Sequence, residues 1–214
     1  MKKPLILIGG GGHCKACIDV IEMEGIYAIE GIIDTKEKTG TTVLQYPIVG
    51  DDSQLEEYIK KGFAFLITIG QIKSAVPRKK LYETLVEKNA TLATIVSPIA
   101  VVSKYARVGK GTIIMHQAVI NADASIGDNV ILNTGSLIEH DVKVSEHVHI
   151  STKAVLNGGV FIGEESFVGS NSVLVQNINV GSKVIIGAGA TVASDIITAG
   201  VYVGSPARYI DTKE

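Results

Sequence analysis

The stretch IGDNVILNTGSLIEHDVKVSEHVHISTKAVLNGGVFI, residues 126–162, places Ile, Leu or Val at every sixth position. The same spacing continues without interruption from Val96 to Val192. The seventeen positions are Val96, Val102, Val108, Ile114, Ile120, Ile126, Leu132, Ile138, Val144, Ile150, Leu156, Ile162, Val168, Leu174, Val180, Ile186 and Val192. A period of six fits neither an α-helix nor ordinary strand alternation, and it is typical of a repeat protein, or solenoid.

Each six-residue unit is expected to be a short strand followed by a turn. Three units close a triangular coil of eighteen residues, and successive coils stack at the strand spacing of ~4.8 Å. The seventeen units then form between five and six coils, a prism about 25 Å long. The inward aliphatic side chains supply a core in a chain that has no Trp. Residues eighteen positions apart are therefore predicted to lie in adjacent coils, one above the other.

The first ninety residues lack this period and alternate between strand and helix patterns. Leu5–Ile8 predicts a buried strand, a helix runs from His13 to about Met23, and Tyr27–Ile33 predicts a second strand that ends at Asp34. Further patterns predict an extended piece at 48–50, a helix at 53–60, a strand at 63–69 and a helix at 79–88. This order predicts a small parallel sheet with helices on its faces. We therefore expect two domains, 1–90 and 91–214, with the chain crossing between them at 89–96.

A run of four glycines, residues 9–12, separates the first strand from the first helix. Gly11 and Gly12 would let the backbone approach a phosphate at the helix N-terminus, and Asp34 stands where an acid that binds a ribose or base would lie. Only half of the dinucleotide fingerprint is present, because Cys14 occupies the place of its third glycine. The loop alone leaves nucleotide binding and a purely structural turn both open. Cys14 and Cys17 form a C-x-x-C, which we interpret as two small buried helix residues without a thioredoxin-like context.

Composition excludes several functions. The formal net charge of −2 and the pI of about 6.2 do not suggest binding to nucleic acid or to acidic surfaces. Two cysteines are too few for a disulfide framework. Leu5–Ile8, the longest early apolar run, is too short for a signal peptide or a membrane span. We expect a cytoplasmic protein with no nucleic-acid or membrane partner.

The histidines are the candidates for a general base near neutral pH. Four of the five lie in the repeat, where aliphatics take the inward positions, so they are expected to project outward, with His116 and His147 as ordinary surface residues. His140 has an acid on each side, and Gly158 is predicted to stack directly over it, with a bare N–H available to a reacting carbonyl oxygen. The same arithmetic stacks three small residues as the floor of a groove for a slender ligand: Thr152, Ser170 and Ala188.

At these residues the chain resembles the bacterial hexapeptide-repeat sugar acetyltransferases. That family includes UDP-4-amino-sugar N-acetyltransferases, GDP-perosamine N-acetyltransferases and sialic acid O-acetyltransferases. The similar segments are 8–20 (IGGGGHCKACIDV), 69–70 (IG), 131–141 (ILNTGSLIEHD), 148–151 (VHIS) and 204–208 (GSPAR). The resemblance implies a Rossmann-like βαβαβ domain followed by a left-handed parallel β-helix, and a homotrimer with each active site in the groove between neighbouring prisms.

The resemblance also implies roles for individual residues. His140 matches the base that takes a proton from the sugar amine or hydroxyl, and Asp141 matches the acid that orients it. The residues that match acetyl-CoA contacts are His149, Gly158, Ser170 and Ala188. Asn133 matches a residue near the acceptor sugar, and Gln71 stands where Asn is more usual. The residues that match the nucleotide site are Gly12, His13 and Asp34, with Gly11 beside them.

The function expected from these matches is acetyl transfer from acetyl-CoA to a UDP- or GDP-linked 4-amino-4,6-dideoxy sugar for a bacterial surface glycan. The alternative within the family is O-acetylation of sialic acid. A zinc hydratase of the carbonic-anhydrase type is a remote alternative, since the spacing of histidines 140, 147 and 149 does not match its pattern, and no metal is expected. A non-catalytic solenoid would need a flat repeated outer face such as Thr ladders, which the varied outward residues do not provide.

Overall fold

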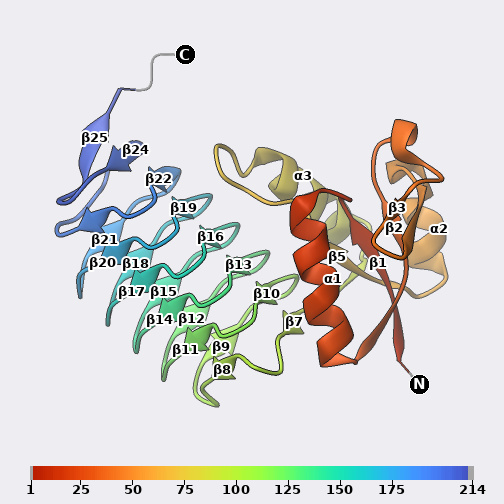
Figure 1. Cartoon of the computed structure of the whole chain (residues 1–214), viewed down its shortest axis with the longest axis horizontal. Helices are drawn as coiled ribbons and strands as arrows, with labels where there is room; N and C mark the ends of the chain where they lie inside the picture. The colour runs from red at the N-terminus through yellow and green to blue at the C-terminus, as the bar shows by residue number, and fades with distance from the viewer. Residues whose placement is uncertain (1, 212–214) are drawn as a thin grey trace.

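The computed structural model describes residues 2–211. Met1 and residues 212–214, which the predicted domain boundaries include, lie outside this described part. An α/β domain forms one end of the molecule and a stack of coils forms the rest, so that the last strands lie at the end farthest from the sheet (Figure 1). No described helix is long and apolar enough to cross a membrane.

The N-terminal domain is a six-stranded sheet with helices on its faces. Its elements are β1 (Lys3–Ile8), α1 (Gly12–Glu24), β2 (Tyr27–Ile33), η1 (Lys36–Lys38), β3 (Thr42–Val43), β4 (Tyr46–Gly50), η2 (Asp52–Gln54), α2 (Leu55–Lys60), β5 (Ala64–Ile67), α3 (Val76–Glu87) and β6 (Thr91–Leu92). The strand order is β3-β4-β2-β1-β5-β6, parallel throughout except for the β3–β4 pair. The parallel sheet predicted from the βαβα pattern is confirmed, and β6 extends it beyond residue 90 before the chain crosses to the coils.

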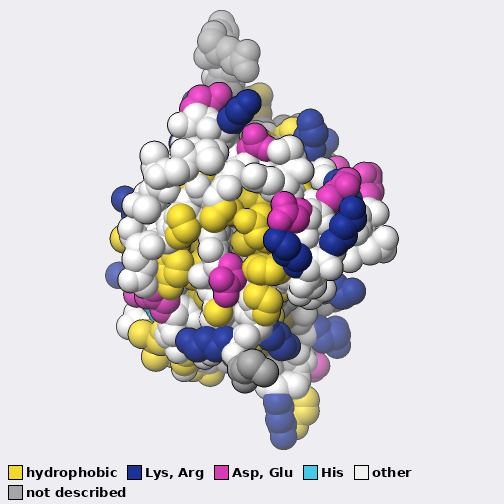
Figure 2. Space-filling model, turned by 90° about the vertical axis from the view of Figure 1, so that its right-hand side faces the viewer, with side chains coloured by type: hydrophobic (Ala, Val, Ile, Leu, Met, Phe, Trp, Pro, Cys, Tyr) yellow, Lys and Arg dark blue, Asp and Glu magenta, His cyan; other side chains and the backbone are white. Residues whose placement is uncertain are grey.

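The central strands of this domain are buried on both faces, as their unbroken apolar sequences require. Leu5, Ile6 and Leu7 of β1 have no exposed surface. The side of the domain that faces away from the coils carries a patch of hydrophobic side chains bordered by Lys, Arg, Asp and Glu (Figure 2).

Residues 95–210 form a three-sided parallel β-helix. One sheet contains β7 (Ile95–Val96), β10 (Ile113–Ile114), β13 (Ile131–Leu132), β16 (His149–Ile150), β19 (Phe167–Val168), β22 (Val184–Ile186), β24 (Gly200–Val203) and the antiparallel β25 (Arg208–Ile210). The second contains β8 (Val101–Val102), β11 (Val119–Ile120), β14 (Leu137–Ile138), β17 (Val155–Leu156), β20 (Val173–Leu174) and β23 (Thr191–Val192). The third contains β9 (Arg107–Val108), β12 (Ser125–Ile126), β15 (Lys143–Val144), β18 (Phe161–Ile162) and β21 (Asn179–Val180).

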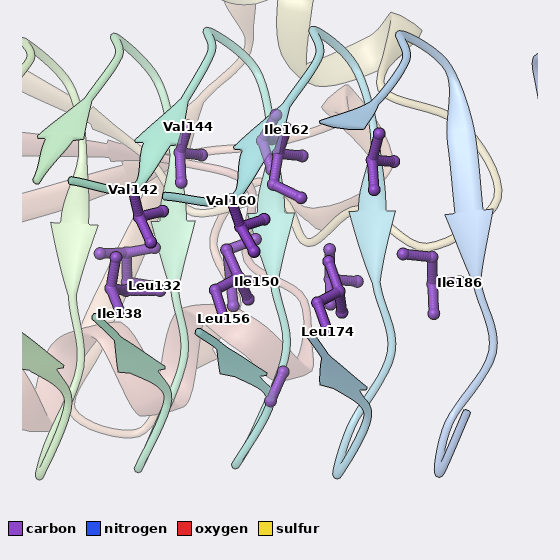
Figure 3. Packing of buried hydrophobic residues seen from close by; sticks show 14 of the residues in the cluster. Leu132, Ile138, Val142, Val144, Ile150, Leu156, Val160, Ile162, Leu174 and Ile186 are labelled. Atoms are coloured by element: carbon purple, nitrogen blue, oxygen red, sulfur yellow. The ribbon is translucent and has the colours of Figure 1, made fainter. Parts of the chain in front are cut away.

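The register repeats every eighteen residues, as the period predicts. Ile138 of β14 pairs with Leu156 of β17, which in turn pairs with Leu174 of β20. The aliphatic side chains of successive coils point into the prism and pack on one another (Figure 3). Leu132, Ile138, Ile150, Leu156 and Ile162 are fully buried. At about 1.5–3 kcal/mol for each buried aliphatic side chain, this ladder is the main stabilising contribution to the prism.

Between residues 111 and 189, each corner of the prism turns through one residue with a left-handed backbone. These residues follow one another at intervals of six, from Gly111 through Asp123, Asn129 and Gly135 to Gly189, with φ between 54° and 70°. Gly, Asn and Asp adopt this conformation at low cost, which explains their frequency at these positions. Asp141 is one of them, with φ of 61°.

Helix α1 joins the two domains by packing on the outer face of the sheet that contains β7, β10 and β13 (Figure 1). Cys17, Ile18 and Ile21 of the helix lie in one buried cluster with Ile113 and Ile131 of the prism. This docking leaves the N-terminal end of α1 beside the middle coils, where polar side chains from both domains meet.

Candidate active site

His140 and Asp141 lie at the corner between β14 and β15. The Nδ1 of His140 is 2.8 Å from the Oδ2 of Asp141, and both side chains are well exposed. The hydrogen bond to Asp141, opposed by slight burial and reinforced by the charges of Asp141 and Glu139, raises the pKa of His140 above its ordinary value. Because Asp141 engages Nδ1, the lone pair of Nε2 is left available to accept a proton.

Gly158 lies against the His140 ring from the next coil. A Cβ atom at Gly158 would meet Cε1 of His140 at 2.6 Å and Nε2 at 2.8 Å. The coils are joined at this point by the N–H of Gly159, which donates to the carbonyl of His140 at 3.0 Å. Within residues 2–211 the N–H of Gly158 has no hydrogen-bond acceptor. A basic imidazole and a free peptide N–H therefore share one corner of the prism.

A cavity of about 680 Å³ opens between the N-terminal domain and the first sheet of the prism. We call it the junction pocket. The predicted ligand-binding residues that line it are Gly11, Gly12, His13, Asp34, Gln71, Asn133, His149 and Ser170. These positions come from both domains and span about 160 residues of sequence, so the docking of the domains is what creates the pocket.

The glycine run contributes two different kinds of glycine. Gly9 has φ of 103°, and a Cβ there would meet Ile69 at 2.4 Å, so the fold itself requires glycine. Gly11 and Gly12 have nothing within 4 Å of an added Cβ. They begin α1 without a side-chain cap and line the junction pocket, which leaves N–H groups and the positive end of the helix dipole facing it.

Asp34 follows the last residue of β2 and lies at the rim of the junction pocket. One carboxylate oxygen accepts from the N–H of Gly10 at 2.6 Å, the other accepts from the N–H of Thr35 at 2.7 Å, and Lys38 pairs with the group at 3.0 Å. Burial alone would raise its pKa, but these hydrogen bonds from Thr35, Lys38 and Gly10 hold the pKa below the usual range. Asp34 is thus an ionised carboxylate that fixes the glycine loop and stays balanced by Lys38.

His149 has a fixed tautomer inside the junction pocket. Its Nδ1 lies 2.6 Å from the carbonyl oxygen of Gln71, which can only accept, so Nδ1 carries the proton. Nε2 is then an acceptor, and the side-chain amide of Asn133 lies 3.3 Å from it. Burial lowers the pKa of His149 to about 4. His149 faces outward from the prism, since its neighbour Ile150 takes the inward position, but the N-terminal domain covers β16 and leaves His149 only 6% exposed.

His13 lies close to His149, with ring centroids 6.3 Å apart. Burial, together with the charge of Arg78, lowers the pKa of His13 to about 3. Both pocket imidazoles are therefore neutral at physiological pH. His147 is also buried, at 4% exposure, because the Gln71 side chain and α3 lie over it, so its prediction as a surface residue is wrong. His116 lies 2.8 Å from Asp19 of α1, at the edge of the domain junction.

The structure separates the predicted site residues of one chain into two groups. His140, Asp141 and Gly158 occupy the corner after β14 and β17, whereas Asn133, His149 and Ser170 face the junction pocket. Ala188 is exposed on the column of Ser170, at the corner that follows the first sheet. The residues of the first group do not line the junction pocket.

Several pocket residues were not predicted from the sequence. The hydroxyl of Thr68 donates a hydrogen bond to the carbonyl oxygen of Gly9 at 2.7 Å, and the hydroxyl oxygens of Ser151 and Ser170 lie 2.9 Å apart. The ring of Phe167 packs edge-on against the ring of His149. Phe167 follows His149 by eighteen residues, so the coil period contained the signal for it. Thr68 is placed by the N-terminal sheet, for which the sequence has no comparable arithmetic.

Other predicted features are structural. Cys14 and Cys17 are fully buried on α1, and burial raises the pKa of both thiols, so the interpretation as small core residues is confirmed. No group of three or more His, Cys, Asp or Glu side chains within the described residues is arranged to hold a metal ion.

Comparison with known proteins places these features in one family. The family model described as the PglD N-terminal domain matches residues 4–85, and the bacterial transferase hexapeptide model matches residues 105–140. The perosamine N-acetyltransferase of Caulobacter crescentus, solved with CoA and GDP-perosamine, is 32% identical over 97% of both chains, with a TM-score of 0.91. The chain belongs to the bacterial hexapeptide-repeat sugar acetyltransferases.

Two further members of the family support this assignment. The acetyltransferase domain of PglB from Neisseria gonorrhoeae is 31% identical, covers 98% of this chain and all of that domain, and superposes with a TM-score of 0.90. It has also been solved with acetyl coenzyme A. The UDP-N-acetylbacillosamine N-acetyltransferase of Bacillus subtilis is 34% identical over 115 residues. That match spans about half the length of the curated relative, 51%, and 53% of this chain.

Family membership confirms the predicted fold, a Rossmann-like domain followed by a left-handed parallel β-helix. At the level of the family, the prediction of an acyltransferase that uses coenzyme A is confirmed as well. Three solved forms of the Caulobacter enzyme hold CoA and GDP-perosamine, and two of them carry a replacement of one histidine.

Proposed function

We propose that this chain transfers the acetyl group of acetyl-CoA to the amine of a UDP- or GDP-linked 4-amino-4,6-dideoxy sugar, as a step in bacterial surface glycan biosynthesis. The observation that carries the proposal is that the ring of His140, paired with Asp141, lies against Gly158, whose N–H has no acceptor within residues 2–211. Acyl transfer needs a base for the nucleophile and a donor for the oxyanion. This corner supplies both.

The reaction follows from these two groups. The sugar amine attacks the thioester carbonyl while Nε2 of His140 accepts the proton that the nitrogen loses. The N–H of Gly158 donates to the carbonyl oxygen as it becomes negative. Collapse of the tetrahedral intermediate breaks the C–S bond, and the proton on His140 passes to the departing thiolate of CoA. No residue of the chain needs to carry the acetyl group, and both cysteines are buried away from this corner.

The junction pocket fits the nucleotide portion of such a substrate. Free N–H groups at the start of α1 suit the diphosphate, and Asp34 lies where the ribose would follow it. The neutral imidazole of His13 would contact the nucleotide portion as well, and the amide of Asn133 would face the sugar. His149, on the same wall, would contact acetyl-CoA. The slender acetyl-CoA arm fits the column of small residues, Ser170 and Ala188, that continues from this wall.

The two groups of site residues lie on different faces of one prism, and a homotrimer would reunite them. We infer that the His140 corner of one copy closes the groove beside the junction pocket of its neighbour. Gly158, His140 and Asp141 would then face the acetyl-CoA column of the adjacent prism. The exposure of the His140 and Asp141 side chains, 65% and 63% in the single chain, supports this arrangement.

A substrate panel tests the proposal directly. Purified protein would be assayed for free thiol release from acetyl-CoA with UDP- and GDP-linked 4-amino-4,6-dideoxy sugars, and with sialic acid in parallel. We expect turnover with one nucleotide-linked amino sugar and an amide in the product by mass spectrometry. Turnover with sialic acid alone, giving an ester, would replace the proposal by the O-acetyltransferase alternative. Light scattering of the same sample would test the trimer.

A further inference from the structure

Within residues 2–211, Arg78 is a buried cation without an acidic partner. It lies in the first turn of α3 and is 1% exposed. Its guanidinium donates only to carbonyl oxygens: to Ile67 at 2.6 Å, to Ile69 at 3.1 Å and, across the domain junction, to Asn129 at 3.4 Å. Nη2 has no partner among the described residues. Burying an unpaired charge costs several kcal/mol, and a cation in the first turn of a helix also opposes the helix dipole.

The position of this charge connects it to the junction pocket. Ile69 and Gln71 line the pocket, and Arg78 bonds the carbonyl of Ile69 from behind that wall. Its charge reaches the rings on the other side, because it contributes to lowering the pKa of both His13 and His149. Burial lowers the pKa of Arg78 itself to about 10, which still leaves it charged at neutral pH.

The remaining charges of the pocket cancel. Asp34 pairs with Lys38, and the two histidines of the pocket are neutral. The charge of Arg78 is therefore the uncompensated one at this wall, within the described residues. Together with the N–H groups of Gly11 and Gly12, it gives the pocket a net positive potential before any ligand binds.

We propose that Arg78 is the fixed counter-charge for the diphosphate of the nucleotide-linked sugar, acting through the pocket wall without touching the ligand. This inference rests on the proposed function and adds a residue that the chain uses to hold its substrate. Arg78 is a positioning residue in this sense. The cost of its burial would then be offset when the anion occupies the pocket. A purely structural clamp between the domains is the competing explanation, since Arg78 also bridges Ile67 and Asn129.

Paired ligands that differ only in charge separate these explanations. UDP and GDP would be titrated against uridine and guanosine, by calorimetry for the diphosphates and ligand-observed NMR for the nucleosides. The variants are Arg78→Gln, which removes the charge, Arg78→Lys, which keeps it, and Lys104→Gln, an exposed charge removed from the first coil as the matched control. Circular dichroism would verify folding.

We expect Arg78→Gln to weaken binding of the diphosphate about tenfold, the size expected for one charge acting through protein, while nucleoside binding is retained. Arg78→Lys and Lys104→Gln should remain within about threefold of wild type. Equal losses for diphosphate and nucleoside, or no loss, would overturn the proposal in favour of a clamp.

Arg78→Lys is decisive alone if Arg78→Gln does not fold. Lysine keeps the charge but cannot reach Ile67, Ile69 and Asn129 together. A folded lysine variant that retains diphosphate binding supports the counter-charge, and one that loses it refutes it. If the wild-type protein binds neither UDP nor GDP, the proposal of a nucleotide-linked substrate is overturned together with the role of Arg78. If the wild-type protein binds a diphosphate and Arg78→Gln binds it equally well, only the role of Arg78 is overturned.

Discussion

The prism corner and the junction pocket use histidine in opposite ways. At the corner, His140 is exposed and its pKa is raised by the hydrogen bond to Asp141. In the pocket, His13 and His149 are enclosed by two domains, and burial lowers their pKa values to about 3 and about 4. The same side chain is thus placed to take up a proton at one site and prevented from doing so at the other.

The environment of each histidine determines whether it can serve in catalysis or in binding. A general base must change its protonation state near the working pH, which His140 can do. A group that recognises a fixed donor pattern works best when its protonation does not change, and the Gln71 carbonyl ensures this for His149 by fixing Nδ1–H. Substitutions at the corner and in the pocket test this division.

Replacing His140 by Ala should have the largest effect. Loss of a general base commonly costs 10²–10⁴-fold, and we expect kcat for acetyl transfer to fall by about 10³-fold. Binding of the nucleotide-linked sugar should change by less than about threefold, since His140 lies outside the junction pocket. Single-turnover kinetics and calorimetry on the folded variant would measure both. Retention of more than a tenth of wild-type kcat would contradict the role of His140.

Replacing Gly158 by Ala should have the next largest effect on kcat. The new Cβ would lie 2.6 Å from Cε1 of His140 and must push the ring aside, while the backbone of Gly158 is not in the left-handed region. We expect a loss of roughly 10–100-fold in kcat with little change in thermal stability, because the displaced ring is exposed. In a His140→Ala background the same change should cost nothing further. Additive losses would show that the two residues act separately.

Asp141→Asn tests the origin of the raised pKa. Asn tolerates the left-handed backbone of residue 141, so the corner should keep its shape. His140 is a base only when neutral, and activity therefore rises with pH through its pKa. Without the carboxylate this pKa falls, so the rising limb of the kcat profile should move to lower pH, while the plateau drops roughly tenfold because the ring is less basic. If the rising limb did not move, the ionisation that controls kcat would not be that of His140.

How much of this was predictable depends on the region. The eighteen-residue coil placed Gly158 over His140 from the sequence alone, because strand register in a strict repeat is arithmetic. It did not reveal that His147 and His149 are covered, since their burial comes from α1, α3 and Gln71 of another domain. Docking of two surfaces depends on shape, and no period encodes it. The unpaired charge of Arg78 was invisible for the same reason.

The smallest predicted effect concerns stability rather than activity. In the folded chain, His149 stays neutral until the pH falls to its pKa of about 4. In the unfolded chain, the same imidazole takes up a proton near pH 6.5. Its contribution to the free energy of unfolding is therefore fully present above pH 6.5 and is lost as the pH falls toward 4. The limit of this loss is about 3 kcal/mol. His149→Gln should flatten the pH dependence of the urea midpoint between pH 7 and pH 4.5.

The corner histidine supplies the matched control with the opposite sign. The folded pKa of His140 lies above its unfolded value, so its contribution is present at low pH and disappears as the pH rises through the folded pKa. His140→Gln should leave the loss of stability toward pH 4.5 intact or slightly steeper, whereas His149→Gln reduces it. Parallel urea titrations at pH 7.0, 6.0, 5.0 and 4.5 would compare the two variants with wild type. Equal slopes for all three proteins would mean that the N-terminal domain does not hold the His149 imidazole neutral, and the contrast between corner and pocket would fail.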